Sequence, residues 1–327
     1  MKALLLHEPN TWQTMRIEEV DTPTLRSGEV LIEGEYAGLN PVDYKTATNG
    51  KSEWSYPHIL GLDVAGTIAA IADDVTNVQI GDRVLYHSNW NEWGGFAEFT
   101  RAKAHMVVPI PESISFADAV ALPTAGFTAY QAIFEKLPMN AIDTILIHAG
   151  AGGVGGFAIQ LAKYLGKRVI TTASARNHDW VKQLGADEVI DYNTEDWQQR
   201  VMELTSGHGV NAVIDPVGRE TATASLQVIA YNGHIAHIAG APDMSVIKPF
   251  TRVISYHEVA LNAIHHQQDR VSEANIVRIG THMLELLAAG EIQPMIQETI
   301  PFADIPKKLV ELSDRHVVGK IVANLKA

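Results

Sequence analysis

The sequence predicts a two-domain α/β protein, with an antiparallel β-rich domain and a second domain built on a doubly wound parallel sheet. A change of rhythm along the chain is the main evidence. Up to about Pro123, short apolar runs are broken by Gly, Pro and Asp, and helical periodicity is scarce. From Thr144 onward, apolar runs alternate with helical segments, which is typical of parallel strands joined by helices.

In the first part of the chain, several segments alternate apolar and polar residues in the manner of half-buried strands. We expect these strands at residues 2–7, 30–36, 64–71, 83–86 and 96–100.

The second part predicts a six-stranded sheet. Its strands are expected at residues 144–149, 168–172, 188–190, 212–215, 234–238 and 258–263. Between the first two, Phe157, Leu161 and Leu165 lie on one face of a predicted helix over residues 157–165.

The end of the chain is too short to form a domain. It contains a predicted helix at 273–289 and a predicted strand at 320–325, which we expect to pack back on the first domain. The predicted domains are therefore residues 1–123 with 265–327, and residues 124–264.

A glycine-rich turn follows the strand at 144–149. Gly150, Gly152 and Gly155 match G-x-G-x-x-G, between a buried-type strand and an amphipathic helix. Glycines let backbone N–H groups approach a pyrophosphate at the helix N-terminus. We expect this turn, with Gly153 and Val154, to bind a dinucleotide; an ordinary glycine-rich turn without a ligand is the alternative.

The end of the next strand bears on which dinucleotide binds. An NAD site usually places Asp or Glu about twenty residues after the turn, on the ribose hydroxyls. Here the strand is followed by Ser174 and Arg176, with no carboxylate. A guanidinium suits a 2′-phosphate, so NADP(H) is favoured over NAD, although Arg176 can equally be read as a solvated loop charge.

Composition excludes several functions. The net charge of −13 disfavours nucleic-acid partners, since it repels phosphate backbones. The absence of cysteine excludes disulfides, thiol chemistry and cysteine-based zinc sites. No apolar run approaches the length of a membrane helix, and a cytoplasmic enzyme is expected.

Six fragments in order resemble the medium-chain dehydrogenase/reductase superfamily, and within it the zinc-independent, zeta-crystallin-like quinone oxidoreductases. The resemblance spans essentially the whole chain and implies a GroES-like catalytic domain and a Rossmann NADP(H)-binding domain. Its markers are residues 38–43, 61–66, 78–84, 94–98, the turn at 150–156, and 316–320.

Zinc alcohol dehydrogenases of this superfamily hold catalytic zinc with Cys, His and Cys. The matching positions here are Asn40, Leu62 and Thr124, and these residue types do not compete for zinc. We therefore expect no metal. A zinc-dependent alcohol dehydrogenase relative stays an alternative, with His58 and His87 as possible ligands.

The resemblance also implies cofactor contacts. Tyr192 matches a residue that often lines the 2′-phosphate pocket, Thr128 a position near the nicotinamide, and Lys320 a tail residue that approaches the cofactor. Gly240 is expected among the cofactor-binding residues as well. For Tyr192, Thr128 and Lys320, a purely structural or surface role is an equal alternative.

For catalysis, the resemblance places the nicotinamide between the domains, with Asn40 and Asp43 beside it. Asn40 is expected to hydrogen-bond a substrate oxygen or the cofactor ribose, whereas Asp43 has a more structural role. Trp54 and Tyr56 are candidates to cover the substrate by stacking, although lid or core packing is favoured for both.

The expected reaction is hydride transfer to a quinone or an α,β-unsaturated carbonyl, because their negative charge spreads without a Lewis acid. A regulatory or structural NADPH-binding protein is the alternative. We expect a homodimer or homotetramer, joined at an edge strand formed by residues 259–263.

Overall fold

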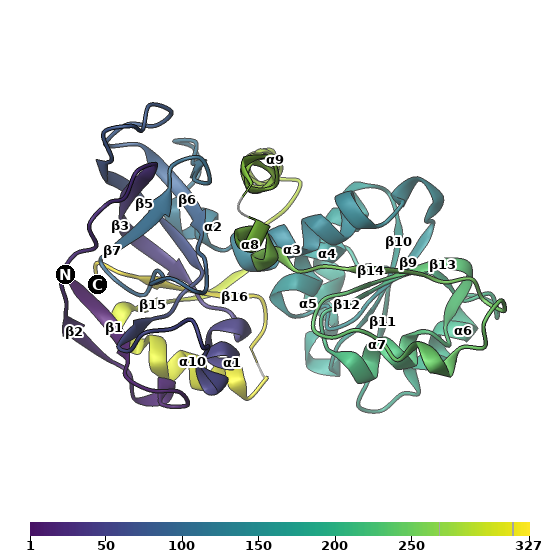
Figure 1. Cartoon of the computed structure of the whole chain (residues 1–327). Coiled ribbons are helices and arrows are strands. Elements are labelled where there is room, and N and C mark those ends of the chain that lie inside the picture. The colour runs from purple at the N-terminus through teal and green to yellow at the C-terminus, as the bar shows by residue number, and fades with distance from the viewer. Residues whose placement is uncertain (268, 316) are drawn as a thin grey trace. The chain divides into compact units, whose positions relative to one another are not determined.

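The structure is a computed structural model that describes residues 1–267, 269–315 and 317–327 (Figure 1). The chain forms two compact units. The first unit comprises Met1–Phe127 and Asn262–Ala327, and the second comprises Thr128–Leu261. His316, which belongs to the tail marker, lies outside the described residues.

The first unit is β-rich, as the sequence predicts. A seven-stranded sheet has the order β15-β16-β3-β5-β6-β8, with β7 also paired to β3, and a three-stranded sheet has the order β2-β1-β4. These strands are β1 (Lys2–Leu6), β2 (Arg16–Glu19), β3 (Glu29–Gly38), β4 (His58–Ile59), β5 (Asp63–Ile71), β6 (Arg83–His87), β7 (Phe99–Lys103), β8 (Val108–Pro109), β15 (Ile296–Pro301) and β16 (Lys320–Asn324).

Helices complete the first unit. They are η1 (Trp12–Thr14), α1 (Pro41–Asn49), α2 (Phe116–Val120), η2 (Pro123–Phe127), α8 (Ile264–Gln267), α9 (Arg270–Ala288), η8 (Phe302–Asp304) and α10 (Ile305–Ser313). The predicted helix at 273–289 is α9, which buries Ile276, Ile279 and Met283. Its N-cap is Asp269, whose carboxylate accepts a 2.8 Å hydrogen bond from the Ser272 amide.

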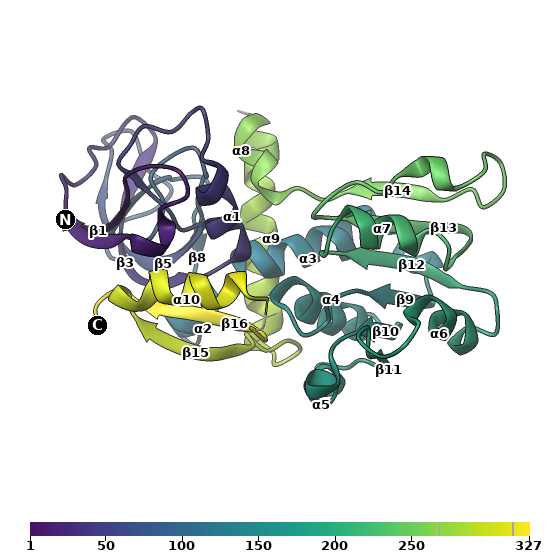
Figure 2. The same ribbon diagram turned by 90° about the horizontal axis from the view of Figure 1, so that it is seen from below.

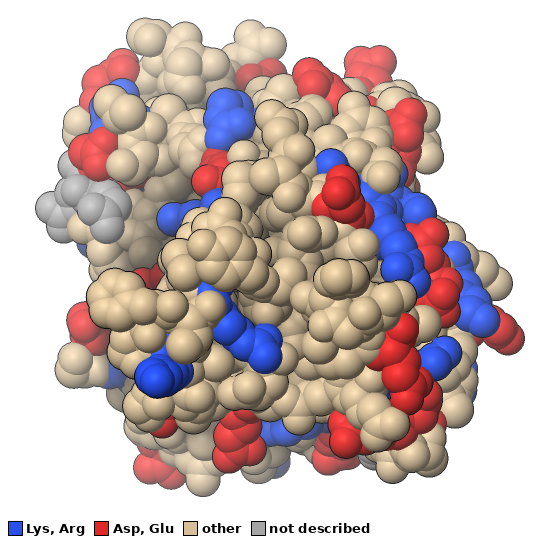
Figure 3. Space-filling model, turned by 90° about the vertical axis from the view of Figure 1, so that its right-hand side faces the viewer, with Lys and Arg blue, Asp and Glu red and all other residues tan. Residues whose placement is uncertain are grey.

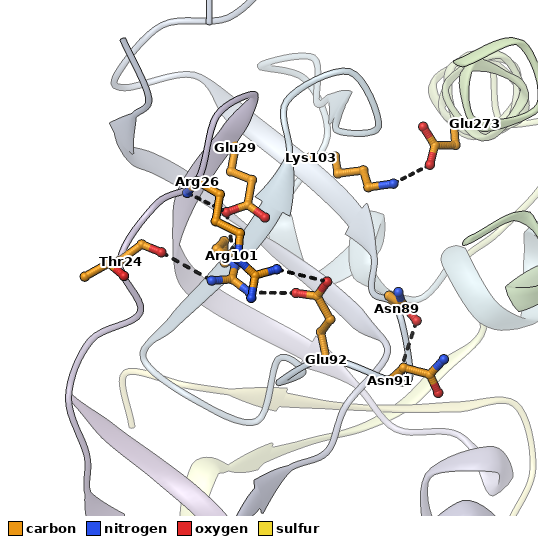
Figure 4. Close-up of polar contacts among 9 residues, drawn as sticks. All are labelled: Thr24, Arg26, Glu29, Asn89, Asn91, Glu92, Arg101, Lys103 and Glu273. Atoms are coloured by element: carbon orange, nitrogen blue, oxygen red, sulfur yellow. Dashed lines mark hydrogen bonds and ion pairs between the residues drawn. The ribbon is translucent and has the colours of Figure 1, made fainter. Parts of the chain in front are cut away.

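Charged side chains link β7 to its surroundings in the first unit (Figure 4). Arg101 Nη2 lies 2.8 Å from Glu92 Oε2, and Lys103 forms an ion pair with Glu273 of α9. His105 Nε2 lies 2.6 Å from the other carboxylate oxygen of Glu273. Burial raises the pKa of Glu273, but the hydrogen bonds from Lys103 and His105 outweigh this and hold it below its ordinary value. This ionised carboxylate therefore ties α9 to β7.

The second unit is a doubly wound Rossmann sheet. Its six strands are all parallel, in the order β11-β10-β9-β12-β13-β14, which can be followed strand by strand in Figure 2. They are β9 (Thr144–Ile147), β10 (Arg168–Thr172), β11 (Glu188–Ile190), β12 (Val210–Asp215), β13 (Ile229–His237) and β14 (Ser255–Glu258). The predicted six-stranded sheet is thus confirmed.

The helices of the second unit either precede β9 or connect the strands of the sheet. They are α3 (Thr128–Tyr130), η3 (Gln131–Lys136), η4 (Met139–Ala141), α4 (Gly153–Tyr164), η5 (Ala175–Asn177), α5 (His178–Gln183), α6 (Trp197–Leu204), α7 (Arg219–Ser225) and η6 (Met244–Val246). The face that predicted a helix at 157–165 belongs to α4, in which Phe157 and Leu161 are fully buried.

Two predicted strands are misplaced. The strand expected at 96–100 begins later, as β7, because Phe96 and Ala97 instead bond to the segment around β1 and β4. The last Rossmann strand is β14 rather than residues 258–263, where η7 (Leu261–Ala263) lies. The apolar residues 259–263 suggested a strand, whereas β14 is a partly exposed edge whose residues, Ser-Tyr-His-Glu, lack that apolar signal. The expected edge at 259–263 was therefore wrong.

Candidate functional sites

The glycine turn lies at the carboxyl end of β9, next to β12. This is where the strand order of a doubly wound sheet reverses and where such sheets bind ligands. The amide of Gly150 donates to Thr172 O (3.0 Å), and that of Gly152 donates to Ala149 O (3.0 Å). Both bonds hold the turn between β9 and the first residues of α4.

Glycine is required at two positions of this turn. A Cβ on Gly155 would lie 2.2 Å from the carbonyl oxygen of Ala149, and one on Gly150 would lie 2.2 Å from Thr171 Oγ1. The backbone of α4 can therefore approach β9 closely only with glycine there. The α4 N-cap is Gly152, so no side chain occupies the position from which a cap would accept its first amides. A pyrophosphate fits such a helix start.

Four further predicted cofactor residues lie after strands of the same sheet, beyond their carboxyl ends. Ser174 and Arg176 follow β10, and Tyr192 follows β11, which pairs with β10 in parallel. Arg176 is exposed, and Tyr192 is 54% exposed. Gly240 comes three residues after β13. The structure thus places all four residues on the side of the sheet that carries the glycine turn.

Asp215, at the end of β12, was missed by sequence reasoning. Its Oδ1 accepts hydrogen bonds from the amides of Val217 (2.7 Å) and Gly218 (2.9 Å), while its buried Oδ2 has no partner within the described part of the chain. Burial raises the pKa of Asp215 to about 6, against those two hydrogen bonds. An acidic residue that ends a buried strand at the reversal point was the available signal.

A buried polar cluster lies in the first unit, around Asp63. Asp63 Oδ1 accepts hydrogen bonds from the amide (2.9 Å) and hydroxyl (2.6 Å) of Thr124, and its Oδ2 accepts one from Asn40 Nδ2 (2.7 Å). Lys320 Nζ lies 2.6 Å from Asn40 Oδ1, 3.1 Å from Leu39 O and 3.6 Å from Asp63 Oδ2. These contacts fix the Asn40 amide, with its oxygen toward the ammonium and its nitrogen toward the carboxylate.

Burial controls the charges of this cluster. Lys320 is only 2% exposed, so it is not a surface lysine. Burial lowers the pKa of Lys320 and raises that of Asp63, and their opposite charges counteract both shifts. The pair offsets part of the cost of burying either charge.

Asp43 belongs to the same cluster but accepts fewer hydrogen bonds than Asp63. Asn40 caps α1, and its amide N–H donates to Asp43 Oδ2 (2.8 Å), which completes a capping box. Asp43 Oδ1 is buried and finds no hydrogen-bond partner among the described residues. Burial raises the pKa of Asp43 to about 8, and the nearby Asp63 carboxylate adds to the rise. Asp43 is therefore largely protonated at neutral pH.

The positions that match zinc ligands in the alcohol dehydrogenases, Asn40, Leu62 and Thr124, meet around Asp63. Asn40 and Thr124 are engaged by its carboxylate, and the Leu62 side chain has no donor atom. Across residues 1–267, 269–315 and 317–327, no group of three or more His, Cys, Asp or Glu is arranged to hold a metal ion. The donor set at these positions does not fit zinc.

Trp54 and Tyr56 are packed within the first unit. The indole of Trp54 stacks on His58 (ring centroids 4.1 Å apart) and donates to Trp90 O (2.7 Å). Burial lowers the pKa of His58 to about 4, so this ring is neutral. Trp54, His58 and Asp43 line a cavity of about 10 Å³, which is the size of a single water molecule.

His87 is the second histidine considered above as a possible zinc ligand. It is the last residue of β6 and pairs with Asp63 in the antiparallel register of β5 and β6. Its ring stacks on His265 (centroids 5.7 Å apart), and burial lowers the pKa of His87 to about 3.

Thr128 is buried at the start of α3 in the second unit. No helix of the described residues is long and apolar enough to span a membrane.

Comparisons with known proteins agree with this architecture. The sequence profile of the alcohol dehydrogenase GroES-like domain matches residues 26–112, and that of the zinc-binding dehydrogenase matches residues 153–276. The chain is 30% identical over 315 residues to the chloroplastic quinone-oxidoreductase QR1 of Triphysaria versicolor, covering 93% of this chain and 92% of that protein.

Two further relatives are informative. A zinc-type alcohol dehydrogenase-like protein of Staphylococcus epidermidis is 29% identical over 323 residues, covering 94% of this chain and 93% of that protein. The structure of Escherichia coli quinone oxidoreductase complexed with NADPH superposes with a TM-score of 0.88 at 25% identity. That match covers 99% of this chain and 100% of that one.

Proposed function

Because the chain belongs to the quinone oxidoreductase branch of the medium-chain dehydrogenase/reductase superfamily, we propose that it is a zinc-independent, NADPH-dependent reductase of quinones or α,β-unsaturated carbonyl compounds. The observation that carries the proposal is the glycine turn after β9, whose close backbone approach leaves the start of α4 open to a pyrophosphate.

The choice of NADPH over NADH rests on Arg176 and Tyr192. Their strands β10 and β11 are neighbours in the sheet, so both side chains follow strand ends on the same side of the turn. A guanidinium can bind a 2′-phosphate with paired hydrogen bonds, and an exposed tyrosine can pack beside it. The relative solved with NADPH supports the same choice.

In this proposal the bound NADPH supplies a hydride. In the first unit, we assign Asn40 to the acceptor oxygen that gains negative charge, because one Nδ2 hydrogen has only a 3.5 Å contact with Gly38 O. Lys320 and Asp63 hold the Asn40 amide in its orientation. Asp43 holds the Asn40 backbone through the capping box. In the second unit, we assign Thr128 to a contact with the nicotinamide. The charge spreads over a quinol or enolate, so these groups need only support it by hydrogen bonds.

Zinc has no role in the proposed chemistry. Of the positions that match the zinc ligands of alcohol dehydrogenases, Leu62 has no donor atom, and Asn40 and Thr124 donate hydrogen bonds to Asp63. An alkoxide, whose charge stays on one oxygen, would be poorly supported there. This supports conjugated acceptors over simple alcohols or ketones.

We also propose that two copies associate along β14, the edge strand of the Rossmann sheet. Exposed apolar side chains gather in the segment that leads into this strand: Met244, Val246, Phe250 and Val253. Tyr231 of the neighbouring strand β13 is exposed as well. Figure 3 shows a broad area without charged side chains on one face of the molecule. Unpaired strand groups beside apolar residues favour pairing with another chain.

The test follows oxidation of NADPH and NADH by chelator-treated protein, with 1,4-naphthoquinone and 2-hexenal as acceptors. We expect NADPH-selective turnover of at least one acceptor that survives chelation. NADPH binding without turnover of either acceptor would contradict the enzyme and favour a cofactor-binding regulatory protein. Activity that is lost on chelation and restored by zinc would contradict the zinc-free mechanism.

A further inference from the structure

His148 lies between β9 and the glycine turn and makes two side-chain hydrogen bonds inside the second unit. Its Nδ1 is 3.1 Å from the hydroxyl oxygen of Thr172, at the end of β10, and its Nε2 is 2.9 Å from the hydroxyl oxygen of Ser225 in α7. The ring is 2% exposed and packs edge-on against Trp197. One imidazole therefore bridges a strand end and a helix.

The neighbouring bonds determine where the ring proton lies. The Ser225 hydroxyl donates to Thr221 O (2.8 Å), so it accepts from His148, and Nε2 carries the proton. Thr172 Oγ1 accepts from the amide of Ala149 (3.1 Å) and donates its own proton to Nδ1. Burial lowers the pKa of His148 to about 3, so the ring stays neutral. The chain of bonds thus runs in one direction from Ala149 to α7.

Ala149 links this chain of bonds to the glycine turn. Its φ is +53°, in the left-handed region that a non-glycine residue rarely adopts. Its carbonyl accepts from Gly152, and it is the atom that a Cβ on Gly155 would strike. A small shift of Ala149 would therefore move the start of α4, where the pyrophosphate is proposed to bind.

The other end of the chain of bonds reaches α7, which follows β12. Strands β9 and β12 are neighbours on the two sides of the reversal point, so the segments after them flank the position where a dinucleotide binds. We infer that His148, as the neutral Nε2–H tautomer, is a positioning residue that holds the glycine turn and α7 in register for the cofactor. This role rests on the proposed binding of NADP(H).

Three variants at His148 test its hydrogen bonds to Thr172 and Ser225 separately. His148→Phe removes both hydrogen bonds. His148→Asn can still accept from Thr172 at the former Nδ1 position, whereas His148→Gln can still donate to Ser225 at the former Nε2 position. We expect the dissociation constant of NADPH to rise about tenfold in His148→Phe, in line with the loss of buried hydrogen bonds. His148→Asn should keep most of the affinity, because it preserves the link to Ala149, and His148→Gln should keep less.

Two ligands distinguish positioning from general damage. Adenosine 2′-phosphate lacks the pyrophosphate, so its affinity should be unchanged in all three variants while that of NADPH falls. Thr172→Val should reproduce the effect of His148→Phe, and the two together should be no worse than either alone. Nitrogen NMR of histidine-labelled wild type should show the Nε2–H tautomer for the resonance that His148→Asn removes.

Equal NADPH affinity of wild type and His148→Phe would overturn the inference and leave the proposed function standing. Parallel weakening of both ligands would also overturn it, since that points to loss of structure. A wild-type chain that binds neither NADPH nor adenosine 2′-phosphate would contradict the proposed function, and this role with it.

Discussion

Replacing Lys320 by methionine removes the ammonium from the buried cluster of the first unit while keeping a side chain of similar length. Asp63 would keep its three hydrogen bonds from Thr124 and Asn40, but its charge would lose the ion pair. Removing one partner of a buried ion pair typically costs about 3 to 5 kcal/mol. We expect a loss of that size in the free energy of unfolding.

The loss should depend on pH. The pKa of Asp63 is already above its ordinary value and should rise further without Lys320. A group with a raised pKa in the folded state stabilises that state at low pH, and the stability is lost as pH rises through the folded-state pKa. Lys320→Met should therefore be more destabilised at pH 8 than at pH 5.

Urea unfolding followed by tryptophan fluorescence suits this measurement, because Trp12, Trp54, Trp90 and Trp93 all lie in the first unit. Lys326→Met is the matched control in the same unit: it removes a half-exposed partner of Glu33, a kind of pair that contributes about 1 kcal/mol or less. The double variant Lys320→Met/Asp63→Asn should recover part of the stability, since it leaves no unpaired charge. A loss in Lys320→Met no larger than in the control, at both pH values, would refute the reasoning.

Three further predictions concern the two candidate sites. Asp43→Asn should weaken the fall of the melting temperature between about pH 4 and pH 8, because the wild-type carboxyl, with its pKa raised to about 8, keeps its proton in the folded state while the unfolded chain releases it. An identical pH profile in both proteins would count against a protonated Asp43. Arg176→Gln should lower the preference for NADPH over NADH about tenfold or more, as expected for a lost charge-assisted hydrogen bond, and kcat/KM for both cofactors measures it. Gly155→Ala should abolish NADPH binding in a titration, because its Cβ would lie 2.2 Å from Ala149 O. Gly166→Ala, whose Cβ meets nothing within 4 Å, should still bind although its φ of +70° costs some stability, and it therefore controls for backbone strain alone.

The Rossmann half was the more predictable part of the fold. Buried parallel strands are continuous apolar runs, so β9, β10 and β11 could be placed nearly to the residue. Strand β14 was missed because an edge strand can keep polar side chains, and the apolar run after it forms a 3₁₀ turn instead. Local apolar patterns indicate which residues are buried, and an edge strand buries few of its residues.

The polar cluster was only partly predictable. The sequence indicated Asn40 and Asp43 as site residues. It did not indicate Asp63, although Asp63 lies in the family marker at residues 61–66. An acid between Leu62 and Val64 at the start of a buried strand implies a buried partner, and this was the available signal. The partner, Lys320, lies more than 250 residues further along the chain. No local pattern distinguishes it from a surface lysine.

Strand β16 lies between β15 and β3, so a segment near residue 320 completes a sheet that begins near residue 29. During synthesis, the second unit, which is one continuous stretch, emerges from the ribosome before β16 exists. Until then, residues 36–38 of β3 lack their partner strand, although β5 and β7 can already pair with β3. The order of translation thus favours assembly of the cofactor-binding unit before the unit that carries Lys320.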